Sequence, residues 1–258
     1  MSTDDEFFIG WQGRAPLGLA RFARARVAAG VAVALARGGA LAAWQRPFAA
    51  AHFEFGVSRV FEGTLEHVPY PTLVVARPDA AGSRSGWLLT RFGKVGAEDV
   101  TSRLDGRRVR FEGSLVHRDG VTMVELDPAT LVDLGPRLRA WAGDGDGAAP
   151  AAAPTRRAVT LRGEIVDSKC FLGVMKPGDL KTHRACAVRC ISGGVPPALV
   201  VRDAEGRATY YLLVDEDGAA VNERVLGLVA EPLEVTGTVE ELDSLLVLRA
   251  SPDTFRRL

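Results

Sequence analysis

A duplicated order of strands, helix and hairpin is the feature that most restricts the fold. The first copy has strand-like runs at 61–63, 72–76 and 87–90, a helical pattern at 97–104 and a hairpin at 109–126. The second copy has the same elements at 161–163, 198–201, 210–214, 219–228 and 233–248. Gly113 to Pro128 and Gly237 to Pro252 both span 15 positions. Equal spacing over matching hairpins indicates a tandem repeat.

Three strands, a helix and a hairpin form the order of a five-stranded Greek-key barrel of the OB type. An SH3-like barrel lacks the helix, and an immunoglobulin sandwich needs more strands. The sequence therefore predicts a mainly β protein with two OB-like five-stranded barrels, at residues 53–141 and 158–258. A run rich in Gly, Ala and Pro at 142–157 is typical of a linker. We expect the two cores to share little stability across it.

The two copies differ in one connection. Gly63 and Leu73 are 10 positions apart, whereas Gly163 and Leu199 are 36 apart, so the second copy carries 26 extra residues between its first two strands. In OB folds this connection lies at the ligand-binding mouth. A long irregular loop on a small barrel is usually functional or cross-linked. The first copy, with its short connection, is expected to be a spacer or docking domain.

All three cysteines of the chain fall in or beside this insertion, together with one histidine. Thr182 as N-cap and Gly193 as terminator predict a short helix from His183 to about Ile191. On it His183, Cys186 and Cys190 lie within roughly 60° of one another, on one face. Cys170 precedes them on a loop that can fold back. Three thiolates and an imidazole form a four-ligand set that suits zinc or copper.

Two other interpretations remain open for the cysteines. Ala187, Val188, Cys190 and Ile191 also form an apolar arc, so the thiols could be small buried hydrophobic groups. In an exported protein, Cys170 could instead pair with Cys186 or Cys190 in a disulfide that staples the loop. A Cys186–Cys190 bridge within a regular helix has poor geometry. Any single disulfide leaves one thiol over.

The insertion also carries a motif. The run D-S-K-C-x-x-G-V-M-K-P-G begins at Asp167, and H-R-x-C-A-x-x-C-x-x-G-G-x-P-P begins at His183. This resembles the signature of a bacterial family that is anchored by one membrane helix and associated with respiratory redox components. The start at 5–11 (DEFFIGW) is also similar to that family. The resemblance implies a topology and a respiratory context, and no particular reaction.

A weaker similarity links Cys186-x-x-x-Cys190 and His183 to copper sites. The binuclear copper site of cytochrome oxidase subunit II, and the chaperones that load it, have a comparable cysteine spacing. Those sites lie on other folds and place their histidine after the cysteines, whereas His183 comes before them. The similarity implies copper only as one of two candidate metals.

The segment 27–44 (VAAGVAVALARGGALAAW) contains a single charge, Arg37, and predicts a transmembrane anchor. Arg37 costs roughly 2.5–3.5 kcal/mol on insertion scales, but arginines crowd the N-terminal flank, and Trp44 and Phe48 fit an aromatic belt. By the positive-inside rule residues 1–52 are a cytoplasmic tail and inner-membrane anchor, with the barrels in the periplasm. A cleaved signal peptide, with a site near 49–51, and an amphipathic core helix are the alternatives.

The composition and the absence of catalytic motifs argue against two classes of function, nucleic-acid binding and catalysis. The 32 basic and 32 acidic residues balance, so there is no basic excess for binding nucleic acid. The chain has no nucleophile elbow, P-loop or dinucleotide fingerprint, which favours a non-enzymatic role.

We therefore expect an accessory or assembly subunit of a membrane redox system, whose partners are the membrane and other redox subunits. Its Cys/His cluster would bind a metal or present redox thiols for electron transfer. The alternative is a scaffold protein with a structural disulfide.

Overall fold

The computed structural model describes residues 13–44, 51–67, 69–77, 83–136 and 155–258. The start at 5–11, the predicted belt residue Phe48, and most of the predicted linker lie outside these ranges. The chain divides into two compact units, Met1–Pro47 and Phe48–Leu258.

The first unit is the helix α1 (Leu17–Trp44). Residues Leu17–Ala43 are long and apolar enough to cross a membrane as a single span, and a signal sequence has the same properties. The helix begins ten residues before the predicted apolar segment. The flanking arginines Arg21, Arg24 and Arg26 therefore lie within the helix, before its apolar part.

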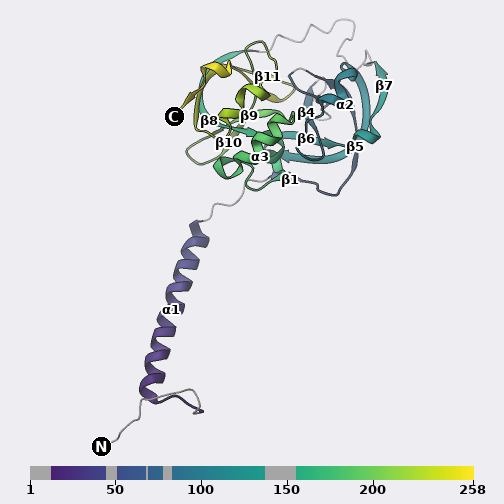
Figure 1. The fold of residues 1–258 in the computed structure, drawn as a ribbon. Coiled ribbons are helices and arrows are strands. Elements are labelled where there is room, and N and C mark those ends of the chain that lie inside the picture. The colour runs from purple at the N-terminus through teal and green to yellow at the C-terminus, as the bar shows by residue number, and fades with distance from the viewer. Residues whose placement is uncertain (1–12, 45–50, 68, 78–82, 137–154) are drawn as a thin grey trace, which may run out of the picture. The chain divides into compact units, whose positions relative to one another are not determined.

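The second unit contains both predicted barrels (Figure 1). The first barrel is formed by β2 (Arg59–Glu66), β3 (Thr72–Ala76), β4 (Arg84–Arg91), β5 (Arg107–Arg118) and β6 (Val121–Leu126). Its closed order is β2-β3-β4-β6-β5, with β5 returning to β2 and with β4 and β6 parallel. Helices α2 (Glu98–Thr101) and η1 (Ser102–Leu104) connect the third and fourth strands. This is the predicted OB-type order.

The second barrel repeats this order with β8 (Arg157–Asp167), β9 (Pro197–Arg202), β10 (Ala208–Val214), β11 (Leu233–Leu242) and β12 (Leu245–Arg249). Its strands β10 and β12 are again parallel, and β11 closes the barrel onto β8. Helices α4 (Asn222–Val225) and η5 (Leu226–Leu228) occupy the same place as in the first barrel. Three short strands were not predicted: β1 (Ala51–Phe53) and β7 (Val132–Pro136) pair with β5, and β13 (Arg256–Arg257) pairs with β11.

The insertion lies between β8 and β9, as predicted. It consists of a π-helical turn, η4 (Cys170–Val174), and α3 (Leu180–Ser192). The expected N-cap was wrong, because α3 begins at Leu180 after Asp179, and Thr182 is already inside the helix. The terminator is confirmed: the N–H of Gly193 bonds to carbonyls of the last turn, including that of Cys190 at 3.1 Å.

The two cores are in contact, although the linker led us to expect that they share little stability. Each barrel has a core of its own, but a third cluster of buried side chains joins them. Leu88, Val116 and Met123 of the first barrel belong to this cluster with residues of the second barrel such as Phe171 and Leu212. Burial of side chains from both barrels in one cluster links their stabilities, because removing either barrel exposes apolar surface on the other.

Tyr70 adds a polar link to this apolar interface. Its hydroxyl donates to the carbonyl of Leu213 at 2.8 Å and accepts the N–H of Val221 at 3.2 Å. The side chain is buried. A first-barrel residue therefore satisfies two backbone groups of the second barrel.

Candidate metal centre

The first half of the site is built where β8 ends. Asp167 is fully buried, and its Oδ1 accepts the backbone N–H of Cys170 at 2.8 Å. This hydrogen bond starts the tight turn of η4, as a side-chain cap does at a helix N-terminus. Cys170, the first residue of that turn, is itself buried.

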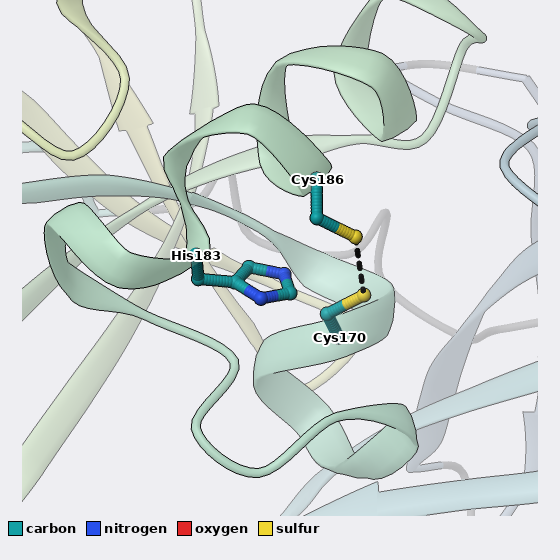
Figure 2. Close-up of side chains that lie close together, drawn as sticks. All are labelled: Cys170, His183 and Cys186. Atoms are coloured by element: carbon teal, nitrogen blue, oxygen red, sulfur yellow. Dashed lines mark hydrogen bonds between the residues drawn. The ribbon is translucent and has the colours of Figure 1, made fainter.

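The second half comes from α3. Its buried positions include His183, Ala187 and Cys190, and the predicted helical face is therefore the one that packs against the barrel. Cys186 lies on the same side and is half-buried. In Figure 2 the side chains of Cys170, His183 and Cys186 point toward one another across the space between η4 and α3.

These side chains converge closely enough for one ion. The ligand atoms of Cys170, His183 and Cys186 all lie within 4.8 Å of one another, and those of Asp167, Cys170 and Cys190 form a second such group. The Sγ atoms of Cys170 and Cys186 are 3.9 Å apart, which suits two sulfurs on one ion because Zn–S bonds are about 2.3 Å. All three cysteines are free thiols. The structure thus distributes the four sequence-predicted residues over two overlapping groups that share Cys170, and among the described residues no such group contains all four.

Asp167 is a site residue that the ligand prediction did not include. Its Oδ2 lies 3.2 Å from Nε2 of His183, and both side chains are buried. A carboxylate in this position orients the imidazole of a metal-binding histidine. The quoted motif contains Asp167, but its role depends on the fold, because only the return of α3 brings His183 beside the end of β8.

The thiols form a hydrogen-bonded set. The pKa of Cys190 lies below its ordinary value because the Cys170 thiol donates a hydrogen bond to it, with further help from the nearby charge of Lys94. The pKa of Cys170 is raised, first because it bonds to Cys190, and also because it is buried and near Asp167. The cluster therefore favours a thiolate on Cys190, and a thiolate is the form that binds metals.

The first barrel also reaches the cluster. Lys94, in the connection after β4, places its Nζ 2.6 Å from Sγ of Cys186. The pKa of Lys94 is raised, mainly by this contact with Cys186. The first barrel, expected to be a spacer or docking domain, thus places a charged side chain at the cluster. Nothing in the sequence pattern indicated this, because Lys94 lies 92 residues from Cys186.

The cavity beside α3 does not coincide with the cluster. A cavity of about 500 Å³ opens beside the N-terminal end of α3, and none of its lining residues is a cysteine or histidine. The ionic side chains on its wall have partners: Glu164 pairs with Arg202, and Lys181 pairs with Glu231. The thiols and the imidazole, rather than this cavity, are therefore the chemically distinctive part of the molecule.

Comparison of the chain with protein-family models, with curated proteins and with solved structures finds no match in any of the three.

Proposed function

We propose that this protein is a membrane-anchored accessory or assembly subunit of a respiratory redox system, and that it binds zinc or copper through Cys170, His183, Cys186 and Cys190. One observation carries the metal-binding part. Two chain segments converge so that three thiols and an imidazole lie in overlapping groups with ligand atoms less than 5 Å apart. The respiratory part is supported by the motif that begins at Asp167.

The donor set fits a soft ion. Thiolate sulfurs and imidazole nitrogen are the ligands that Zn²⁺ and copper prefer, and three protein thiolates with one histidine is a known zinc set. Asp167 would hold His183 in orientation. A bound ion would supply either a structural cross-link between η4 and α3 or, as copper, an electron-transfer centre.

The proposed topology has the N-terminus in the cytoplasm and both barrels in the periplasm. It is supported by the arginines that precede the apolar part of α1. A reporter fused after Leu258 should be active only when the reporter is one that works outside the cytoplasm. Activity of a cytoplasm-specific reporter at that position would refute the topology.

Metal content of the purified full-length protein tests the site. We expect about one zinc or copper ion per chain, by elemental analysis of detergent-purified protein. The variant Cys186→Ser/Cys190→Ser, and separately His183→Asn, should lose most of it. His52→Asn is the matched control, because the His52 side chain is 68% exposed and pairs with Glu54, away from the cysteines.

The respiratory role needs a test of its own. Membranes from cells that lack the protein should lose respiratory electron-transfer activity. The wild-type gene should restore that activity, and the double cysteine variant should not. Full restoration by the double variant would remove the cluster from the proposed role.

A scaffold with a structural disulfide is the second candidate, and one distance favours it. Cys170 and Cys186 have their sulfurs 3.9 Å apart, so a small movement could join them. Thiol titration of metal-free protein under denaturing conditions separates the two. Three free thiols support the metal site, whereas a single free thiol with no bound metal supports the scaffold.

A further inference from the structure

The connection after β4 of the first barrel is fixed against the end of α3. The N–H of Gly96 donates to the carbonyl of Gly193 at 2.8 Å. A Cβ atom on Gly96 would lie 2.2 Å from the carbonyl oxygen of Gly194, and one on Gly193 would lie 1.9 Å from that of Lys94. The two backbones approach so closely that only glycine fits at these points.

A buried lysine of the insertion also forms hydrogen bonds with this connection. Lys169 is 2% exposed, and its ammonium donates to the carbonyls of Arg91 and Gly93 at 2.6 and 2.9 Å. It also forms an ion pair with Glu125 of the first barrel. These contacts fix the backbone on the N-terminal side of Lys94, while the glycine contact fixes it on the other side. The backbone that carries Lys94 is therefore fixed beside the end of α3, and the exposed Lys94 side chain reaches Cys186 from it.

From this geometry we infer that Lys94 determines the charge selectivity of the cluster and favours a monovalent soft ion, copper(I), over divalent zinc. The inference rests on the proposed metal-binding function. An ion on Cys186 would lie within a few ångströms of the Lys94 ammonium. Coulomb repulsion scales with the charge of the ion, so a divalent ion is opposed about twice as strongly as a monovalent one.

The other charges near the cluster stay the same when Lys94 is replaced. They therefore do not alter the effect of Lys94 on the preference between the two ions. Asp167 attracts any cation, but it is hydrogen-bonded to His183 and is present whether or not position 94 carries a charge. The ammonium of Lys169 is paired with Glu125. The donor set is compatible with the inference, because the sulfurs of Cys170 and Cys186 and the imidazole of His183 are soft ligands that suit copper(I).

The experiment measures the affinities of the full-length protein for Zn²⁺ and for Cu⁺, each by competition with a chromophoric chelator. Replacing Lys94→Met should raise the affinity for Zn²⁺ relative to Cu⁺ by about tenfold, allowing for solvent and salt screening. Lys94→Arg keeps the charge and should leave the ratio within about twofold of wild type. The ratio is the relevant quantity, because any change in proton competition for the same thiolates affects both ions together.

Lys181→Met is the matched control. Lys181 lies on α3, is 60% exposed and pairs with Glu231, so its removal should leave the ratio unchanged. An equal change for both ions in Lys94→Met, or no change, would overturn the inference while leaving the metal site intact. Wild-type protein that binds neither ion would instead overturn the proposed function and this inference with it.

Discussion

The two barrels have the same strand order, yet they use the same connection points differently. The first barrel joins β2 to β3 by a short loop, whereas the second places η4 and α3 between β8 and β9 and carries every cysteine there. For the connection after the third strand, the first barrel is the copy that contributes to the cluster. In the first barrel it bears Lys94 and contacts the cysteine cluster. The two copies of the fold thus contribute unequally to one cluster, with cysteines and a histidine from one copy and a charged side chain from the other.

This comparison predicts that the barrels unfold together. Phe171 belongs to the shared cluster, stacks near Tyr210 and lies beneath the guanidinium of Arg118, 3.9 Å from the ring centre. Phe171→Ala should lower the free energy of unfolding by about 3–5 kcal/mol. In urea, the fluorescence of Trp87 in the first barrel and the reactivity of Cys190 in the second should report one shared transition.

Phe55→Ala is the control, because Phe55 is 77% exposed and should change stability by less than about 0.5 kcal/mol. Separate transitions for Trp87 and Cys190 would show that the barrels are independent and that the shared cluster contributes little.

The buried ammonium of Lys169 allows a second test, of whether contacts between the two barrels stabilise the protein. Lys169→Met would leave Glu125 and two carbonyls of the first barrel without their donor. Breaking a buried ion pair in this way should cost about 3 kcal/mol. Lys181→Met removes an exposed pair and should cost less than about 1 kcal/mol. Thermal unfolding measures both, and equal effects would show that Lys169 is not a structural link.

The strand order and the insertion could be predicted because they depend on local patterns. Short apolar runs such as 72–76 and 210–214, and the equal spacing from Gly113 to Pro128 and from Gly237 to Pro252, are enough to indicate the repeat. The helical face of His183, Cys186 and Cys190 follows from helix geometry. These features need no knowledge of distant contacts.

The contacts between the barrels could not be predicted in the same way. Lys94 and Tyr70 are ordinary residues in sequence, and each meets its partner only after both barrels have closed. The sequence pattern of a strand shows which of its faces is buried, but not which part of the chain covers that face. The apolar residues of the shared cluster could therefore equally have belonged to the core of a single barrel. The predicted linker suggested independence, although a linker does not prevent two domains from packing together.

Replacing Tyr70 should give the smallest loss of stability of these predictions, and the loss should depend on pH. Burial raises the pKa of Tyr70 well above its usual value of 10.0, so the folded state binds the phenolic proton more tightly than the unfolded chain does. Its contribution to stability is therefore fully present below about pH 10 and is lost as pH rises above that value toward the folded pKa. Tyr70→Phe should cost about 1–3 kcal/mol at pH 7, because Leu213 and Val221 lose their partner.

The same change should weaken the loss of stability above pH 10, since one of the titrating groups is gone. Tyr210, whose pKa is also raised by burial, would account for part of what remains. Tyr211→Phe is the control, because Tyr211 packs at the edge of the second barrel's own core rather than in the shared cluster. Urea titrations between pH 7 and 11 measure both variants. An unchanged alkaline slope in Tyr70→Phe would show that this hydroxyl does not couple the two barrels.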